Sequence, residues 1–195
     1  MGRRLGVMGG TFDPIHYGHL VTAEEALAQF ELEGVLFVPT GLPCMKAHEI
    51  VSPAEDRYLM TVIATASNPL FRVSRIEVER EGPTYTVETL RALKAEEDAD
   101  LYFITGADAI LEIVQWKDRA DLFDLARFIA ATRPGYDMAG FEVPGEMSDT
   151  VTVMNIPALA ISSTDIRERV KAGRPIRYLV PEGVKSYVEK ARLYR

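Results

Sequence analysis

Two histidines, His16 and His19, stand three residues apart, shortly after the glycine pair Gly9–Gly10. The segment follows a short apolar run, Leu5 to Met8, that predicts a buried strand, and it precedes an amphipathic run that predicts a helix. Glycines let a backbone approach a ligand closely, and a helix N-terminus offers unpaired N–H groups and the positive end of a dipole. If the helix begins near Pro14, both histidines lie on one face. The pattern therefore predicts a phosphate-binding turn.

Other chemistry is open to two histidines at this spacing, namely metal binding or proton transfer. Structural zinc takes four protein ligands and catalytic zinc three, and no third candidate lies near them in the sequence. A single histidine at a helix start is more often structural, but the pair behind two glycines favours an anion site. The segment contains neither the dinucleotide fingerprint G-x-G-x-x-G nor a P-loop, which disfavours an oxidoreductase.

A second segment of similar character, Ser162 to Arg167, opens a predicted helix near the other end of the chain. Ser162 and Asp165 match a capping box. Hydroxyls and a guanidinium at a helix start also suit an anion. The two segments must meet in space to form one site, which we expect if the first and last parallel strands lie near the switch point of a sheet.

Predicted strands and helices alternate along the chain, and these elements must position the two segments. A second capping box, Ser52 to Glu55 with Pro53 as first helical residue, opens a predicted helix. The alternation predicts one domain over residues 1–195, a Rossmann-like doubly wound parallel α/β sheet flanked by helices in three layers. The predicted strands are Leu5–Met8, Val35–Pro39, Phe71–Glu79, Asp100–Gly106, Arg127–Thr132 and Val151–Ile156. The predicted helices run from about Pro14 to Glu33, Ser52 to Ser67, Val87 to Glu97, from Asp108, from Ser162 to Gly173, and from Pro181 to Leu193.

Composition narrows the function classes. The chain of 195 residues is 47% hydrophobic and 26% charged, which is ordinary for a globular protein. A net charge of −7 argues against nucleic acid as a partner bound through a broad basic face. The one cysteine, Cys44, excludes an intramolecular disulfide and fits a cytoplasmic protein. We expect no signal peptide and no membrane span. The oligomeric state stays open, a homo-oligomer included.

Further candidates follow predicted strands. Lys46 lies in the loop from Thr40 to Val51 and could meet a phosphate, although a solvated lysine is the commoner case. The hydroxyl-bearing run Thr84 to Thr86 either caps the next helix or faces a ligand. Asp108 would favour a helix dipole without any ligand. Trp116 is, as a rule, more often a core residue than a ligand platform.

Both segments resemble signatures of the nucleotidylyltransferase superfamily. Its H-x-G-H core corresponds to His16–His19, within the run from Gly9, and its I-S-S-T-x-I-R signature corresponds to Ile161–Arg167. Between them, the chain resembles the bacterial nicotinate-nucleotide adenylyltransferases almost throughout. The further matching pieces are Pro83–Thr86, Gly106–Asp108, Trp116, Arg133–Gly135 and the tail Leu193–Arg195.

The resemblance implies a reaction in which ATP, with Mg²⁺, and nicotinate mononucleotide give nicotinate adenine dinucleotide and pyrophosphate. The mononucleotide's phosphate would attack the α-phosphorus of ATP in line, and the protein would position two polyanions and stabilise the moving charge. It implies His16, His19 and Arg167 as catalytic residues. The implied ATP-binding residues are Gly9, Gly10, Thr11, Phe12, His16, His19, Gly106, Asp108, Arg133, Ser163, Thr164 and Arg167. The implied mononucleotide-binding residues are Lys46, Thr84, Tyr85, Thr86 and Trp116, with the ring of Trp116 stacked on the pyridine. No residue is implied as a ligand of a protein-bound metal.

One departure and several alternatives accompany the resemblance. The family's loop often reads Pro-Pro-His-Lys, whereas this chain reads Pro43-Cys44-Met45-Lys46, which keeps the lysine and lacks the histidine. A phosphopantetheine adenylyltransferase would carry threonine in place of His16. A nicotinamide-mononucleotide enzyme is a closer alternative, and a non-catalytic nucleotide-binding protein belongs to a different class altogether.

Overall fold

A computed structural model describes residues 2–43, 52–112, 118–132, 149–157 and 159–195. The chain packs as two compact units, each built from separate stretches. Unit 1 comprises residues 1–9, 22–36 and 85–158, and unit 2 comprises residues 10–21, 37–84 and 159–195. The prediction of a single domain over residues 1–195 stays a prediction.

The strands form a six-stranded sheet in the order β4-β2-β1-β6-β7-β8. Counted along the chain, its members are in the order 3-2-1-4-5-6 of a doubly wound fold. The predicted Rossmann-like parallel sheet flanked by helices is therefore confirmed. The strand order reverses between β1 and β6, and β8 lies at an edge, so the condition that the first and last parallel strands both lie near the switch point is not met. The strands of this sheet are β1 (Arg4–Gly10), β2 (Gly34–Pro39), β4 (Phe71–Val73), β6 (Asp100–Gly106), β7 (Ala126–Thr132) and β8 (Val151–Asn155).

The helices and the short strands complete the described elements. A separate two-stranded parallel sheet pairs Leu42 with Pro83 and Pro43 with Thr84. Its strands are β3 (Leu42–Pro43) and β5 (Pro83–Thr84). The helices are α1 (Tyr17–Phe30), α2 (Ala54–Thr65), α3 (Thr86–Glu96), α4 (Ala107–Glu112), α5 (Arg119–Leu125), α6 (Ser163–Lys171) and α7 (Glu182–Ala191). Within the described residues, no helix has the length and apolar character to cross a membrane.

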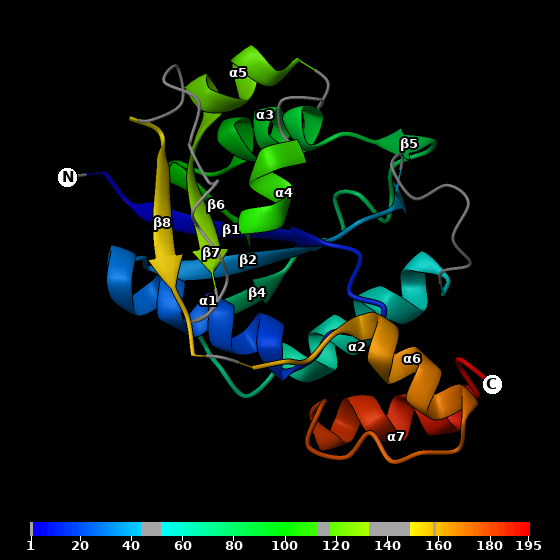
Figure 1. Cartoon of the computed structure of the whole chain (residues 1–195). Helices are drawn as coiled ribbons and strands as arrows, with labels where there is room; N and C mark the ends of the chain where they lie inside the picture. The colour runs from blue at the N-terminus through cyan, green and yellow to red at the C-terminus, as the bar shows by residue number, and fades with distance from the viewer. Residues whose placement is uncertain (1, 44–51, 113–117, 133–148, 158) are drawn as a thin grey trace. The chain divides into compact units, whose positions relative to one another are not determined.

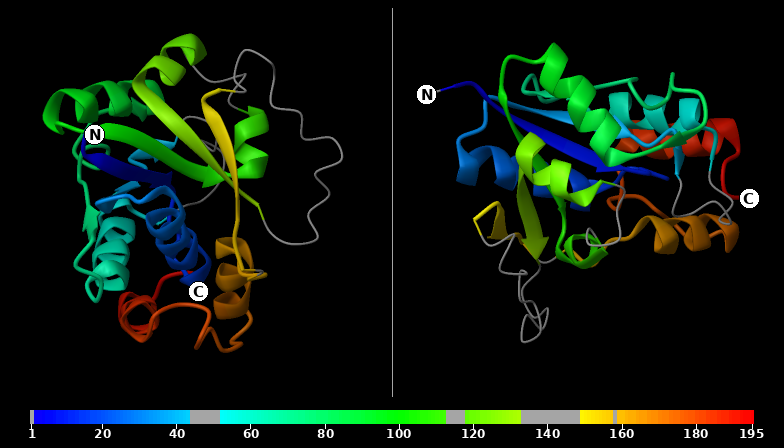
Figure 2. Two further views of the ribbon diagram at one scale, coloured as in Figure 1. Left: turned by 90° about the vertical axis from the view of Figure 1, so that its left-hand side faces the viewer. Right: turned by 90° about the horizontal axis from the view of Figure 1, so that it is seen from above.

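Unit 1 holds the parallel strands β1, β6, β7 and β8, with α1 on one face and α3 and α5 on the other (Figure 1). The two faces are visible in consecutive residues of β6, because side chains alternate along a strand. The ring of Tyr102 lies 6.3 Å from that of Phe30 in α1. The ring of Phe103 instead lies 5.5 Å from Phe128 in β7, and Phe128 lies 5.1 Å from Phe123 in α5. β6 pairs with β7 and β7 with β8, and the left view of Figure 2 shows these three strands together.

Unit 2 is built around α2, which packs against both β4 and α7. The ring of Phe37, in the second half of β2, lies 5.1 Å from Phe71 in β4 and 5.9 Å from Phe12. Gly41 precedes the small sheet, and a Cβ atom there would lie 2.1 Å from the carbonyl oxygen of Glu77, so only glycine fits. This packing brings the loop after β2 close to the segment after β4.

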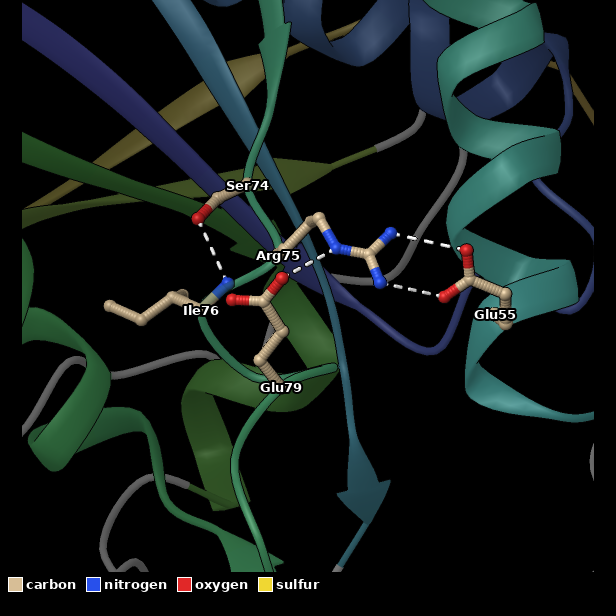
Figure 3. A network of polar contacts seen from close by, with 5 residues as sticks. All are labelled: Glu55, Ser74, Arg75, Ile76 and Glu79. Carbon is tan, nitrogen blue, oxygen red and sulfur yellow. Dashed lines mark hydrogen bonds and ion pairs between the residues drawn. The ribbon is translucent and has the colours of Figure 1, made fainter.

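A surface network in unit 2 joins α2 to the segment after β4 (Figure 3). The guanidinium of Arg75 donates to both carboxylate oxygens of Glu55, at 3.1 and 2.8 Å, and to Glu79 at 2.7 Å. It also lies 4.5 Å from the centre of the Tyr58 ring. The hydrogen bond from Arg75 lowers the pKa of the Glu55 carboxyl, and the two carboxylates raise the pKa of Arg75.

Three predicted elements differ from the structure. The strand expected over Phe71–Glu79 ends at Val73, because the chain then turns: the Ser74 hydroxyl accepts the backbone N–H of Ile76, and the backbone N–H of Glu79 donates to the carbonyl of Arg75. The expected loop from Thr40 contains β3, which its two residues are too short to signal. Sequence analysis missed α5, which begins after Asp118 in a left-handed conformation with φ of 50°.

Candidate active site

The turn at the end of β1 has a strained and closely packed backbone. Phe12 has φ of +50°, a left-handed conformation that is uncommon for any residue except glycine. Gly10 lies beneath its ring, because a Cβ atom at this position would be 2.8 Å from the Phe12 ring. The ring meets His19 edge-on, with centroids 5.1 Å apart. The glycine and the aromatic ring together fix the course of the backbone before the histidines.

The two histidines form a stacked pair. Their ring centroids are 3.7 Å apart with an angle of 25° between the planes, and His16 is buried at 5% exposure. The backbone N–H of His16 donates to Nδ1 of His19 at 3.2 Å. Because Nδ1 accepts this bond, the proton of a neutral His19 lies on Nε2, which makes Nε2 a donor. Gly18 makes the stacking feasible, since a Cβ atom there would lie 2.9 Å from Nδ1 of His16.

This pairing corrects one detail of the expected geometry. Helix α1 begins at Tyr17 and not near Pro14, so His16 precedes the helix and only His19 belongs to it. The carbonyl of His16 accepts the backbone N–H of His19 at 3.0 Å. The histidines are adjacent because the residue before the helix folds over its first turn, and a shared helix face is not the reason.

Helix α6 has the predicted cap. The hydroxyl of Ser162 accepts the backbone N–H of Asp165 at 3.1 Å. The reciprocal half of a capping box is not seen here, because the Asp165 carboxylate instead accepts from Nε of Arg169 at 2.7 Å. One of the amides at the start of α6 is therefore satisfied within the helix itself.

The two predicted segments meet within unit 2. The hydroxyl of Ser163 donates to the carbonyl oxygen of Pro14 at 2.9 Å. Arg167 donates from Nη1 to the carbonyl oxygen of Asp13 at 2.9 Å and from Nη2 to the hydroxyl of Thr164 at 3.3 Å. Residues about 150 positions apart in sequence thus lie in hydrogen-bond contact, as one site requires.

Asp13 is a site residue that sequence reasoning passed over. It is 2% exposed, and both of its carboxylate oxygens accept hydrogen bonds. The hydroxyl of Tyr194 donates to Oδ1 at 2.6 Å, and the backbone N–H of Ser52 donates to Oδ2 at 3.1 Å. Burial, followed by the charge of Asp13, raises the pKa of the Tyr194 hydroxyl. The motif quoted above contains Asp13, but nothing in its spacing shows where the carboxylate points.

Arg57 in α2 was also missed. It is 1% exposed and donates to four backbone carbonyls, at distances between 2.5 and 3.0 Å. Burial lowers its pKa, and the charge of Asp13 opposes that effect. The carbonyls belong to Thr11, Thr40, Gly41 and Ser52. One guanidinium therefore connects the turn after β1, the loop after β2 and the residues before α2.

The predicted capping box at the start of α2 is wrong. The N-cap is Pro53, and it makes no side-chain cap hydrogen bond. Ser52 lies one residue earlier and uses its backbone N–H for Asp13 and its carbonyl for Nε of Arg57. Glu55, expected to reach back to the cap, instead binds Arg75. Both residues of the expected capping box, Ser52 and Glu55, therefore make tertiary contacts in place of the cap.

The remaining candidates belong to other elements of the fold. In unit 1, Tyr85 is the N-cap of α3 without a side-chain cap bond, and Thr86 is the first helical residue. Gly106 is exposed at the end of β6, with open space around it. In unit 2, Thr84 is 5% exposed and its hydroxyl donates to the carbonyl of Leu42 at 3.3 Å, so that hydroxyl serves the small sheet.

Gly9 lies in β1, where a Cβ atom would be 3.2 Å from the Phe103 ring, so it provides space for that ring. Asp108 belongs to α4, but its side chain lies outside the described residues, as do Lys46, Trp116 and Arg133 altogether. The roles implied for these residues stay predictions.

The fold and the paired segments define a nucleotidyltransferase-type α/β protein. Residues 7–169 match the model of the cytidylyltransferase-like family. A protein of Saccharopolyspora erythraea named probable nicotinate-nucleotide adenylyltransferase is 60% identical over 194 residues, which cover 99% of this chain and 90% of that protein. A protein of Corynebacterium glutamicum with the same name is 58% identical over 98% of this chain and 88% of its own length. The chain therefore belongs to the nicotinate-nucleotide adenylyltransferase family.

The solved structures agree with this fold. The Plasmodium falciparum nicotinic acid mononucleotide adenylyltransferase complexed with NaAD superposes with a TM-score of 0.78, over 98% of this chain and 97% of that chain. The two sequences are 20% identical, so the likeness concerns the fold alone. The same parallel sheet is thus found in an enzyme of very different sequence.

Proposed function

We propose that this protein transfers the adenylyl group of ATP to nicotinate mononucleotide, giving nicotinate adenine dinucleotide and pyrophosphate. Family membership supports the reaction class, and one structural observation carries the proposal. The start of α6 is hydrogen-bonded to the Asp13–Pro14 turn through Ser163 and Arg167. The guanidinium of Arg167, the hydroxyl of Thr164 and the stacked histidines thereby belong to one cluster in unit 2, and these groups can donate to phosphate oxygens. The Ser163 hydroxyl gives its one proton to Pro14, so a phosphate contact of Ser163 would use its backbone N–H.

The chemistry needs donors and no covalent nucleophile from the protein. An oxygen of the mononucleotide phosphate forms a bond to the α-phosphorus of ATP, the bond from that phosphorus to the bridging oxygen breaks, and pyrophosphate leaves with the electron pair. A donor such as Nε2 of His19 stabilises charge that develops at the phosphorus oxygens. A guanidinium has five N–H donors, so Arg167 retains donors for phosphate beyond its two protein contacts.

Mg²⁺ is expected as a partner of ATP. Among the residues that the structure describes, no three His, Cys, Asp or Glu side chains are grouped to hold a metal ion. A Mg²⁺ ion that arrives on substrate phosphates needs no such group, because magnesium in such sites is held largely by phosphates and water. The ion would neutralise phosphate charge, and Arg167, Ser163 and Thr164 would hold the phosphates that leave.

The two nucleotides have further expected contacts by family resemblance. For ATP, these are the backbone from Gly9 to Phe12 and three residues elsewhere, Gly106, Asp108 and Arg133. For the mononucleotide, they are Lys46, Thr84–Thr86 and Trp116. The hydroxyl of Thr84 is engaged by the carbonyl oxygen of Leu42, which restricts how Thr84 could contact the mononucleotide. Contact with Thr84 would therefore use its backbone. A cytoplasmic location belongs to the same proposal.

The test is a pyrophosphate-release assay with ATP and Mg²⁺, comparing nicotinate mononucleotide, nicotinamide mononucleotide and phosphopantetheine. We expect kcat/KM for nicotinate mononucleotide to exceed that for the amide by at least about tenfold, because a carboxylate can accept donors that an amide cannot satisfy. Preference for phosphopantetheine would contradict the proposal. ATP binding in calorimetry, without release of pyrophosphate from ATP in the presence of any of the three acceptors, would instead indicate a non-catalytic nucleotide-binding protein.

A further inference from the structure

The reaction described above leaves the buried carboxylate of Asp13 without a chemical task. Both oxygens of Asp13 are engaged by the protein, Oδ1 by the Tyr194 hydroxyl and Oδ2 by the backbone of Ser52. The carbonyl oxygen of the same residue accepts from Arg167. The side chain of Asp13 therefore faces the interior of unit 2 while its main chain faces the start of α6. Its orientation determines where Arg167 finds its acceptor.

Tyr194 reaches Asp13 from the second-last position of the chain, through an unusual backbone. Helix α7 ends at Ala191, and Arg192 and Tyr194 follow with φ of 56° and 63°. Left-handed conformations cost about 1 kcal/mol or more for residues other than glycine and persist where the surroundings fix them. Two of them within three residues fold the tail back, and the result is a 2.6 Å bond to Asp13.

The hydroxyl suits the task of holding a carboxylate beside a site for polyphosphate. An unsatisfied buried carboxylate is costly, and its negative charge would also oppose an anionic substrate. Burial and the charge of Asp13 raise the pKa of the Tyr194 hydroxyl, which favours its protonated, hydrogen-bond-donating form. Arg57 adds positive charge near the same carboxylate. The tail thus completes the satisfaction of Asp13.

We propose that Tyr194 is a positioning residue for adenylyl transfer. Its hydroxyl holds the Asp13 carboxylate, so that the carbonyls of Asp13 and Pro14 keep Arg167 and Ser163 in place. This inference rests on the proposed function, since it concerns the same phosphate-binding cluster. It assigns a catalytic consequence to the C-terminal tail, which itself contributes no group to the reaction.

Unit 2 offers a matched control. The Tyr187 hydroxyl donates to the Asp56 carboxylate at 2.7 Å, which is the same kind of bond with nearly the same length. Both tyrosines are half-buried. Tyr187 belongs to α7 and Asp56 to the first turn of α2, and neither contacts Asp13 or Pro14 through a hydrogen bond that the structure describes. Loss of this bond removes stability without disturbing the turn.

The experiment compares Tyr194→Phe with Tyr187→Phe by steady-state kinetics, well below the melting temperature of each variant. We expect Tyr194→Phe to lower kcat about 10- to 100-fold and to change KM for ATP less than about threefold, because misplaced donors weaken the transition state most. Tyr187→Phe should keep kcat within about twofold of the native value even though its Tm falls. Similar kcat losses in both variants, or a normal kcat in Tyr194→Phe, would overturn the inference.

Asp13→Asn alone supplies a second variant should Tyr194→Phe fold poorly, and where both variants fold a double-mutant cycle tests whether the two residues act together. Asp13→Asn alone should lower kcat, and the double variant should lose clearly less than the product of the two single losses, because the residues act as a pair. Independent, multiplicative losses would overturn the pairing. Activity of the native protein separates the two proposals, since a native enzyme that fails to release pyrophosphate contradicts the function and an active one isolates the role of Tyr194.

Discussion

Helices α2 and α6 both begin beside the Asp13–Pro14 turn, and they are attached to it in opposite ways. Helix α6 caps itself through Ser162, and the side chains of its first two turns reach outward to the turn. Helix α2 has no side-chain cap. Instead the turn reaches toward it, since the Asp13 carboxylate accepts the N–H of Ser52 just before the helix.

The difference separates a helix start for ligand binding from one for support. Arg167 and Thr164 on α6 keep donors for phosphate beyond their protein contacts, and Ser163 would contribute its backbone N–H because its hydroxyl donates to Pro14. The first turn of α2 uses its acidic side chains for structure, with Glu55 bound to Arg75 and Asp56 bound to Tyr187. We therefore expect substitutions on α6 to change catalysis and substitutions on α2 to change stability.

The largest effect is expected for Arg167→Ala on α6. The variant loses a cation at the proposed phosphate cluster and the hydrogen bond to Asp13. We expect kcat to fall about 100- to 1000-fold, which is the usual loss for a donor to a charged transition state. Steady-state pyrophosphate release measures it, with circular dichroism as the check on folding.

Arg167→Lys is the matched control, because it keeps the charge and loses the forked geometry. Its kcat should lie between those of the native protein and Arg167→Ala. An alanine variant with kcat within tenfold of native would place Arg167 outside the transition-state contacts. The start of α6 would then support the fold, as the start of α2 does, and would not bind the substrate.

Arg57→Lys tests the supporting side. A lysine has three donors on one nitrogen and cannot reach the four carbonyls that Arg57 holds, so buried acceptors lose their partners. We expect a loss of about 3 kcal/mol in unfolding free energy, which corresponds to a fall in Tm of roughly 6–12 °C. Thermal denaturation followed by circular dichroism measures it, and a Tm within 2 °C of native would contradict a supporting role.

These contrasts also show how far sequence reasoning extends. The parallel sheet follows from buried apolar runs, and the meeting of His16, His19 and Arg167 in one unit follows from two recognisable segments. The sequence alone does not predict the roles of Asp13, Arg57 and Tyr194, because each role depends on contacts between residues distant in sequence. The two serine caps looked equivalent in sequence. Ser52 does not cap α2, because Ser52 and Glu55 make tertiary contacts that the sequence does not reveal.

A smaller effect is expected at the cap of α6. Ser162→Ala removes the acceptor for the N–H of Asp165 and should cost about 1 kcal/mol in unfolding free energy, with kcat little changed. Ser162→Asn keeps an acceptor at the N-cap and should restore the Tm. Equal Tm values for the alanine and asparagine variants would show that the cap does not stabilise the helix, and α6 would then depend on the turn as α2 does.

The smallest effect concerns Glu55, whose bond to Arg75 stands where a cap contact was expected. Its pKa is lowered from 4.5 by the hydrogen bond from Arg75, so the bond stabilises the fold above about pH 4.5 and loses its effect as the carboxylate is protonated at lower pH. Glu55→Gln should lower the Tm at pH 7 by no more than about 3 °C, since the pair is exposed. The difference between the native and variant Tm values should shrink below pH 4, where the Glu55 carboxylate becomes protonated. It should also shrink in 1 M salt, which screens the attraction between Glu55 and Arg75. A difference that grows on acidification would mean that the glutamate stabilises α2 through a neutral hydrogen bond, and the ionic attachment of this helix would be wrong.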